Sequence, residues 1–385
     1  MSGMPRSPSP TRCTILPPYL LTRLAQVSDP RVADVAQRTL GTDLGVRDRR
    51  TVLGARAGRK DPGLVPPELV RRAKGLDAGR RHEVTAVLPA TPERLIHDAQ
   101  HRTRLPGALV RSEGADPVDD VSVNEAYDGL GATWELLWSA YQRDSLDDQG
   151  LALVASVHFD EGYDNAFWDG AQMVFGDGDG VYFDSFTSCV DVIGHELAHG
   201  LTQFTAGLTY VAQTGALNES ISDVFGSLVK QHHLGQTAAQ ADWLIGAGLF
   251  TDRVTGIALR SMKAPGTAYD DPVLGRDPQP GHLRDYVELP HDGDHDNGGV
   301  HVNSGIPNHA FYLLATELGG AAWERAGRIW FDTVTARGVP RDVDFAGFAA
   351  LTLAAAERRY RAGSPEATAV RGSWAQVGIT VPTSR

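Results

Sequence analysis

The residues best suited to chemistry lie in the segment VIGHELAHGLTQ, residues 192–203. His195 and His199 stand four positions apart there, and Glu196 directly follows the first histidine. On an α-helix, positions four apart share one face at about 6 Å along the axis, whereas Glu196 is rotated away by about 100°. The spacing therefore predicts that both imidazoles bind one metal ion while Glu196 faces the water on that ion. The alternative is an amphipathic helix with ordinary polar residues.

A third ligand is available in the next segment, ALNESISD, where Glu219 follows. Two histidines, one carboxylate and an open position for water form the catalytic zinc pattern, whereas a structural zinc site is closed by a fourth protein ligand. Asp223 and Asn218 are candidates to accept the second N–H group of each imidazole and so to fix its orientation. Taken alone, Glu219 and Asp223 would be interpreted as a solvated helix face.

Helical spacing and end signals place these residues on two helices. Ser188 and Asp191 form a capping-box-like start and Gly207 is a stop signal, so we expect one helix over residues 188–206. In the second segment an apolar stripe recurs with helical spacing. It consists of Leu217, Ile221, Val224, Phe225 and Leu228.

The rest of the chain separates into a strand-rich part and a helical part, which predicts the α+β class. Strands are expected at residues 82–89, 151–159 and 172–183, the last with a hairpin turn at FGDGDG. Residues 121–143 have helical spacing. Further helices are expected at residues 306–320, 322–338, 342–360 and 364–378, several of which end at glycine.

Composition excludes several function classes. The 385 residues, 42% of them hydrophobic, suffice for two domains. No uninterrupted apolar run approaches about 18 residues, which argues against a membrane span, and the Pro-broken start lacks the plan of a secretory signal. Two cysteines, Cys13 and Cys189, cannot form a disulfide framework.

Charge divides the chain unevenly. Residues 1–81 carry 16 basic and 7 acidic residues, a net charge of +9. Because the net charge of the whole chain is −12, the remaining residues carry a net charge of −21. An acidic body of this size repels phosphate, which argues against a nucleic-acid partner. The basic front contains two short helix candidates, PPYLLTRLAQ and DPRVADVAQRTL, followed by an Arg-, Gly- and Pro-rich stretch that is typical of a cleavable linker.

Several motifs in the same order resemble the thermolysin-like neutral metalloproteases, which are gluzincins. They are His195-Glu196-x-x-His199, NESISD (218–223), NAFWDG (165–170), LRSM (259–262) and DNGGVHVNSGIPN (296–308). The likeness covers about residue 85 to the C-terminus, and CTILPPYLLTRLA resembles the short propeptide of the protealysin branch. It implies a two-domain fold, with a strand-rich N-terminal half, an all-helical C-terminal half and a zinc cleft between them. The implied divisions are a propeptide (1–50), a basic processing linker (51–82), an N-terminal catalytic domain (83–206) and a C-terminal α-helical domain (207–385).

The resemblance also implies a role for each matching residue. Zinc would be bound by His195, His199 and Glu219, with Glu196 as general base. Tyr210 and His301 would stabilise the oxyanion, and Asp296 would orient His301. The implied substrate contacts are Asn165, the backbone of Ala166 and Trp168, and Arg260. The implied pocket for the residue after the cut is lined by Phe183, Phe186, Val192 and Leu259, with Phe186 larger than the family's usual leucine.

These roles compete with simpler interpretations. Seen singly, Tyr210 or Trp168 would be a core residue, Arg260 a surface ion pair and His301 a loop histidine. The implied activity is a zinc-dependent endopeptidase, made as a self-processing proenzyme, that cuts on the amino side of bulky hydrophobic residues. Its partners would be protein or peptide substrates and its own propeptide as intramolecular inhibitor. A catalytically inactive zinc-binding or inhibitor-like homologue and a zinc aminopeptidase are the alternatives.

Calcium is doubtful as a second cofactor. Asp191 and Asp242 match two carboxylates of the family's double calcium site, but Lys230, Leu244 and Ala247 replace other ligands. A lysine ammonium can take the place of the cation between the two carboxylates. The loop DGDHDNGGVHVN lacks the glycine and glutamate of a calcium loop.

Three further points stay open. Cys13 is a candidate to cap the zinc in the proenzyme, or else inert packing. His97 and His101 are also four apart, but they fall on an expected strand, where four residues span about 13 Å, so they are not expected to form a metal pair. Most relatives are secreted, although no signal is visible, and a cytoplasmic location is the alternative.

Overall fold

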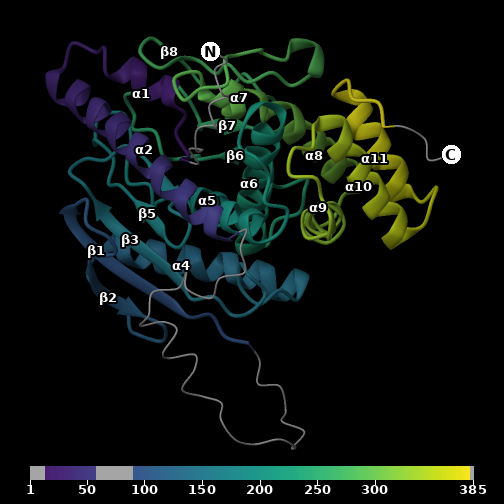
Figure 1. Ribbon diagram of the computed structural model, residues 1–385, viewed down its shortest axis with the longest axis horizontal. Coiled ribbons are helices and arrows are strands. Elements are labelled where there is room, and N and C mark those ends of the chain that lie inside the picture. Colours follow the sequence, from purple (N-terminus) through teal and green to yellow (C-terminus); the bar gives the residue numbers. More distant parts are fainter. Residues whose placement is uncertain (1–13, 58–89, 382–385) are drawn as a thin grey trace, which may run out of the picture.

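The computed structural model describes residues 14–57 and 90–381, and the side chains of residues 44–57 are not described. The expected strand at 82–89, most of the expected processing linker and Cys13 therefore lie outside the described residues. The sheet lies at one end of the molecule, helices α8 to α11 lie at the other, and α5 and α6 run between them (Figure 1). Within the described residues, no helix combines the length and apolar character needed to cross a bilayer.

A five-stranded sheet forms the first half, in the order β2-β1-β3-β5-β4. Its strands are β1 (Arg94–Arg102), β2 (Ala108–Ser112), β3 (Leu153–Phe159), β4 (Ala166–Trp168) and β5 (Met173–Phe175). The three inner strands β1, β3 and β5 are parallel, and the edge strands β2 and β4 are antiparallel to their neighbours. Helix α4 (Val121–Glu135), which a π-helical turn at Leu136–Ala140 extends, contacts β1 and β3.

The expected hairpin at FGDGDG is wrong. Strand β5 pairs with β3 and β4, and residues 181–183 contribute only an isolated bridge between Phe183 and Phe250. The reason is local, because the Asp179 carboxylate accepts hydrogen bonds from the backbone N–H groups of Val181, Tyr182 and Phe183. These three donors are then no longer free to form a strand ladder.

The two helices predicted from the chemistry-bearing residues are α5 (Val190–Phe204) and α6 (Ala212–His233). The expected capping box at the start of α5 is wrong. Cys189 is the N-cap, but its side chain does not cap the helix; Ser188 donates to the carbonyl of Ser185, and Asp191 is bound by Lys230. Gly207, with φ of 58°, follows the helix end, and its N–H bonds back to Thr202.

The apolar stripe of α6 is buried, as its spacing predicts. Glu219 and Asp223 are also fully buried, at 0% exposure each, so their interpretation as a solvated face is wrong. The stripe packs into the protein core on one side of the helix, while α5 covers the acidic side and supplies the acids with histidine partners.

The C-terminal part is mainly helical. Its helices are α7 (Asp296–Asn303), α8 (Gly305–Leu318), α9 (Ala326–Val334), α10 (Phe345–Tyr360) and α11 (Pro365–Gln376). Helices α9 and α11 meet through stacked indole rings of Trp330 and Trp374, 5.8 Å apart. The stretch between α6 and α7, expected as purely helical, contains two small antiparallel sheets and a 3-10 turn. They are β6 (Leu244–Ile245) with β7 (Arg260–Ser261), β8 (Asp270–Asp271) with β9 (Gly275–Arg276), and Leu283–Asp285.

The front of the chain folds onto this body. Helix α1 (Pro18–Leu24) buries its leucines, and helix α2 (Pro30–Ala57) crosses in front of the sheet half (Figure 1). Helix α2 has 28 residues, so it is longer than the short helix expected and crosses the proposed boundary at residue 50. The buried apolar residues of this segment belong to the same core as the body.

The contact between α5 and α6 is unusually close because glycines face each other there. A Cβ at Gly226 would lie 2.4 Å from the carbonyl oxygen of Asp191 and 3.0 Å from the backbone nitrogen of His195. A Cβ at Gly194 would lie 3.1 Å from the Cα of Gly226. This small-residue contact sets the distance between the two helices that carry the metal-binding residues.

We expect Gly226→Ala to destabilise the fold by about 1–3 kcal/mol, because the added methyl group overpacks a backbone contact. The matched control is Gly372→Ala in α11, where the nearest atom is the flexible end of Glu317 at 3.8 Å. The control should be neutral or stabilising by up to about 1 kcal/mol. Denaturant unfolding of both variants checks this, and equal effects would contradict the packing argument.

Candidate active site

Three side chains converge at the contact of α5 and α6. The Nε2 atoms of His195 and His199 lie 3.1 Å apart, and the Glu219 carboxylate lies 3.4 and 3.5 Å from them. Tetrahedral zinc with bonds of about 2.0 Å requires neighbouring ligand atoms about 3.3 Å apart. The predicted ligands His195, His199 and Glu219 are therefore brought together with the spacing that a zinc ion needs.

The outer nitrogen of each imidazole is held by an acceptor on α6. His195 Nδ1 lies 2.8 Å from Asp223 Oδ1, and His199 Nδ1 lies 2.9 Å from Asn218 Oδ1. In a neutral imidazole, the Nδ1 that donates to Asp223 or Asn218 carries the only ring hydrogen, so Nε2 presents a lone pair. Zinc would bind both of these lone pairs, and the residues therefore fit a bound zinc ion.

Ser222 is a neighbour that the sequence reasoning missed. Its hydroxyl lies 3.0 Å from His199 Nδ1, beside the contact of Asn218. The available signal was helical spacing, because Ser222 stands four residues after Asn218 and so shares its face of α6. Its polarity next to a buried imidazole is thus explained by the site.

Asp223 connects His195, a predicted metal ligand, to Arg260, a predicted substrate contact. Its two oxygens accept from Arg260 at 2.8 and 2.9 Å, and its Oδ2 also accepts from the Asn308 amide at 2.8 Å. Burial alone would raise the pKa of Asp223, but Arg260 and His195 beside it hold that pKa down, at about 2. Asp223 is therefore ionised and can orient His195 and Arg260 together. Asn308, which the sequence reasoning did not single out, completes its hydrogen bonding.

Glu196 reaches strand β4 from helix α5. It is fully buried, and its Oε2 accepts the backbone N–H of Trp168 at 3.0 Å. The side chain thus starts on the same helix as both histidines and ends beside the edge of the sheet. This is where a base would stand that serves a water on the metal.

Tyr210 and His301 both lie next to the Glu219 carboxylate. The Tyr210 hydroxyl donates to the Glu219 carboxylate, and His301 Nε2 lies 3.3 Å from Glu219 Oε2. His301 Nδ1 lies 2.6 Å from Asp296, which also accepts the backbone N–H of His301 at 2.8 Å. Burial would lower the pKa of His301, but Glu219 and Asp296 raise it, to about 9. The site thus has two hydrogen-bond donors, Tyr210 and His301, next to Glu219.

The start of α7 shows backbone strain at the residues that hold His301. Asp296 and Asn297 have φ of 55° and 49°, and the two glycines that follow have φ of 87° and 72°. Non-glycine residues occupy this left-handed region only where the surroundings impose it, and such positions cluster at functional sites. The turn places both oxygens of Asp296 against His301.

Residues 14–16 of the chain's own front lie in this site, where Thr14 forms an isolated antiparallel bridge to β4 and residues 15 and 16 form a bend. Thr14 forms a bridge with Phe167, and the N–H of Ile15 donates to the carbonyl of Ala166 at 3.1 Å. The remaining bonds of this segment use side chains predicted to contact substrate or oxyanion. They join the Thr14 carbonyl to His301 (2.9 Å), the Ile15 carbonyl to Arg260 (3.1 Å) and the Leu16 N–H to Asn165 (3.0 Å).

Helix α2 covers the same stretch from the outside. The Asp43 carboxylate is buried and accepts from the Asn165 amide at 3.0 Å and from the Tyr163 hydroxyl. The Thr39 hydroxyl accepts the backbone N–H of Asp164 at 3.2 Å. The front of the chain is therefore bound through its main chain and through specific polar side chains.

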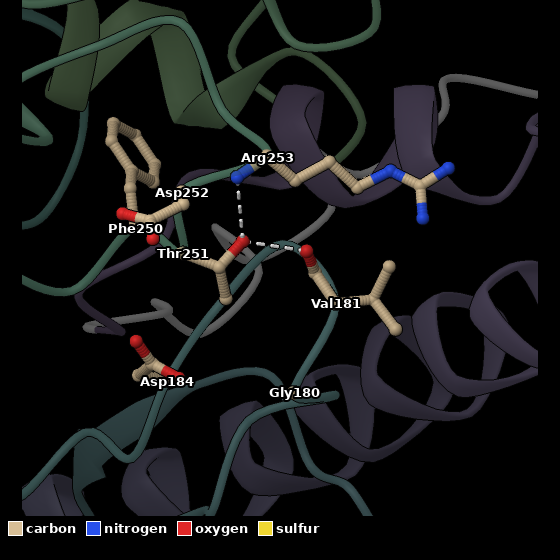
Figure 2. Close-up of a pocket in the computed structure, with 7 residues that line it drawn as sticks. All are labelled: Gly180, Val181, Asp184, Phe250, Thr251, Asp252 and Arg253. Carbon is tan, nitrogen blue, oxygen red and sulfur yellow. Dashed lines mark hydrogen bonds between the residues drawn. The ribbon is translucent and has the colours of Figure 1, made fainter.

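The predicted pocket residues Phe183, Phe186, Val192 and Leu259 are all buried in the main core, to which Ile15 also belongs. The rings of Phe183 and Phe186 lie 6.0 Å apart. The hollow drawn in Figure 2 is a different place, because neither the zinc-binding residues nor these four residues line it. There the Thr251 hydroxyl donates to the carbonyl of Val181 and accepts the N–H of Arg253, so this hydroxyl already has two hydrogen-bond partners (Figure 2).

Lys230 lies where the sequence predicts an internal cation. Its ammonium lies 2.7 Å from Asp191, 3.0 Å from Asp242 and 2.7 Å from the carbonyl of Leu244. Ala247 offers its carbonyl to the thiol of Cys189 instead. The two carboxylates thus have a permanent cation supplied by α6.

We expect Asp223→Asn to weaken zinc binding by about 10- to 100-fold, because an amide orients His195 less firmly than a carboxylate. Glu196→Gln is the control, since it changes no ligand and no ligand's partner, and it should keep its zinc. Competition with a chromophoric chelator measures both affinities. Equal zinc retention in the two variants would contradict the orienting role of Asp223.

Comparison with known proteins agrees with this geometry. A family model described as the catalytic domain of thermolysin metallopeptidase matches residues 94–203, and one described as the alpha-helical domain matches residues 206–379. The chain is 47% identical over 369 residues to an extracellular metalloprotease of Pectobacterium carotovorum subsp. carotovorum, covering 96% of this chain and 97% of that protein. It is 52% identical over 295 residues to protease PrtS of Photorhabdus sp., covering 77% and 78%.

A solved structure is similar over nearly the whole length. The precursor of protealysin, a metalloproteinase from Serratia proteamaculans, matches with a TM-score of 0.81 and 48% identity. The match covers 96% of this chain and all of that one. A thermolysin from a Bacillus strain is 36% identical over 293 residues, covering 74% of this chain and 50% of that protein.

Proposed function

Because the chain belongs to the thermolysin family of zinc metalloendopeptidases, we propose that it is a self-processing precursor that cuts peptide bonds on the amino side of bulky hydrophobic residues. The observation that carries the proposal is the segment of residues 14–16, whose main chain is bound by β4, Arg260 and Asn165. A peptide that extends a sheet edge in this way is a common mode of recognition. In the mature enzyme a substrate takes that place.

Each catalytic step falls to one of the residues described above. His195, His199 and Glu219 would hold zinc, which would supply a water of lowered pKa, near about 7. Glu196 would accept a proton from that water as its oxygen attacks the scissile carbonyl, and would give the proton to the departing amine as the peptide bond breaks. Its position is fixed by the N–H of Trp168.

Tyr210 and His301 act on the carbonyl oxygen of the substrate. Tyr210 already donates to the Glu219 carboxylate, and His301 Nε2 contacts the carbonyl of Thr14 while lying 3.3 Å from Glu219 Oε2, so both lie beside the metal-binding residues. They donate hydrogen bonds as negative charge develops on that oxygen, a contribution of about 10²- to 10³-fold per donor. Asp296 keeps His301 oriented through two hydrogen bonds.

Substrate position and side-chain preference come from separate groups. Arg260, Asn165 and the backbone of Ala166 hold the peptide main chain, as they hold residues 14–16. The pocket of Phe183, Phe186, Val192 and Leu259 receives the residue after the cut. Because Phe186 is bulky, we propose that this pocket is shallower than is usual in the family.

The propeptide inhibits the enzyme by occupying the site until it is removed. Its hold depends on buried apolar residues, including Leu20, Leu21 and Leu24, and on the polar contacts of Asp43 and Thr39. The described ion pair between Arg38 and Asp160 is longer, at 3.6 Å, and partly exposed. Apolar packing and main-chain bonds therefore contribute more than charge within the described part of the interface.

Two further proposals follow from the relatives and from Lys230. Two relatives are named extracellular metalloproteases, and we propose that this chain too acts outside the cell. We also propose that Lys230 makes calcium unnecessary between Asp191 and Asp242, because its ammonium already forms an ion pair with each carboxylate.

The enzymatic proposal is tested by comparing the wild-type chain with Glu196→Gln. We expect the wild type to lose its front by cleavage near residues 51–82 and to cut a peptide library before bulky apolar residues. Glu196→Gln should stay full-length and lose at least about 10²-fold in peptide cleavage, since it lacks the base. Mass spectrometry of both chains and of the peptide products measures this. Equal processing in both would contradict self-cleavage, and an inert wild type would support the inactive alternative.

Inhibition by the propeptide is tested in the Glu196→Gln chain, which cannot process itself. We expect Leu21→Asp to increase the affinity for a fluorescent apolar peptide hydroxamate at least about tenfold, because a buried charge releases the propeptide. The control is Gln26→Asp, which changes an exposed residue in the same segment. If the parent chain binds the probe as tightly as Leu21→Asp, the site is not blocked.

The role of Lys230 is tested by its removal. We expect Lys230→Met to destabilise the fold by roughly 3 kcal/mol, because Asp191 then stays buried without a cation. Lys263→Met, which changes an exposed lysine, should have little effect. Thermal unfolding of the wild type should be unchanged by the calcium chelator EGTA, and a large loss of stability on adding EGTA would contradict the proposal.

A further inference from the structure

A second group of potential metal ligands lies at the carboxyl ends of the inner strands. Strands β1, β3 and β5 run parallel as neighbours, so their carboxyl ends meet at one edge of the sheet. His101 stands at the end of β1, His158 near the end of β3, and Asp177 two residues after β5. The partner of His101 is thus His158 on the adjacent strand rather than His97 on its own.

These three side chains are in direct or near contact. His158 Nδ1 lies 2.8 Å from Asp177 Oδ1, and His101 Nδ1 lies 3.4 Å from Asp177 Oδ2. The two imidazole centres are 5.5 Å apart. Asp120, the N-cap of α4, accepts from His158 Nε2 at 2.8 Å.

We propose that His101, His158 and Asp177 form a second metal site that binds a borderline divalent ion such as Zn²⁺, separate from the catalytic centre. Two imidazole nitrogens and one carboxylate are the ligands that such ions prefer, whereas calcium and magnesium prefer oxygen ligands alone. Asp120 completes the arrangement, because a carboxylate on the outer nitrogen of a ligating histidine fixes its ring and its tautomer.

The geometry needs only a small adjustment. The potential ligand atoms lie within 4.8 Å of one another. A tetrahedral zinc ion needs them about 3.3 Å apart, so the ligand atoms have to approach by at most about 1.5 Å, which a movement of His101 can supply. The side chain of His101 is 58% exposed and therefore has room to move, while the less exposed His158 and Asp177 are already in contact.

The backbone supports a functional role for this edge. Gln100, His101 and His158 have φ of 57°, 54° and 53°, which is the left-handed region that non-glycine residues rarely occupy. Strained residues persist where other interactions over-determine them, and they cluster at binding sites. Here both candidate histidine ligands are strained, and an ion bound by both would hold them in place.

A proton competes with the metal at His158. The hydrogen bond with Asp177 is the main cause that raises the pKa of His158 to about 9, against burial and with help from Asp120. A metal ion at neutral pH must displace this proton, so the second site should bind more weakly than the catalytic one.

A bound ion would brace the segment that holds the propeptide. The loop after Asp177 is bonded to that segment, because Gly178 donates to the carbonyl of Tyr163 and Asp179 donates to the carboxylate of Asp164. The ion would thus link two strands and this loop, and we expect it to act on stability rather than on catalysis.

The test uses the full-length Glu196→Gln chain with its catalytic site filled by one equivalent of Zn²⁺. Co²⁺ is then titrated by calorimetry and visible absorption, while metal analysis verifies that the zinc is retained. We expect one further equivalent of Co²⁺ to bind and to raise the thermal midpoint. His101→Gln and Asp177→Asn should each bind this equivalent at least about tenfold more weakly.

The matched control is His295→Gln, which changes a half-exposed histidine paired with Asp292 outside the cluster. This variant should bind Co²⁺ as the parent does. The proposal is overturned if the parent binds no further equivalent, or if His101→Gln and Asp177→Asn bind it as tightly as the parent. Metal-free thermal midpoints of all variants show that a loss of binding is not a loss of fold.

Discussion

Two imidazole nitrogens that face each other at 3.1 Å are the constraint on which the site depends. Asp223 and Asn218 take the outer nitrogens, which leaves the Nε2 of each neutral imidazole to present its lone pair inward, and Glu219 adds a carboxylate to the same point. A zinc ion at this point would have a nearly complete coordination sphere. The close glycine contact between α5 and α6 keeps the two helices near enough for these groups to meet.

Asp223 extends this constraint to the substrate. One of its oxygens faces His195, and both face Arg260, which in turn binds the carbonyl of Ile15. A single buried carboxylate thereby positions a metal ligand and the group that holds the peptide main chain. The same arrangement underlies the proposed inhibition by the propeptide, because residues 14–16 already occupy Arg260, Asn165 and His301.

The sequence was most informative where a residue's spacing on a helix determined its position. The ligands on α5 and the apolar stripe of α6 follow from periodicity, and the third ligand follows from zinc chemistry. Local sequence patterns gave the wrong structure where another residue bonds to the same polar groups. Lys230 binds Asp191, which was expected to cap the helix, and Asp179 accepts N–H groups that were expected to form the hairpin. Contacts between strands, such as His101 with His158, depend on sheet order, which local patterns do not contain.

The most direct test of the central claim is anomalous X-ray diffraction at the zinc edge from crystals of the full-length Glu196→Gln chain. We predict a strong anomalous peak for a zinc ion that is bound by the Nε2 atoms of His195 and His199 and by the carboxylate of Glu219, with bonds of about 2.0 to 2.2 Å. A zinc-loaded crystal with no peak between these three side chains, or with the three pointing apart, would contradict the account.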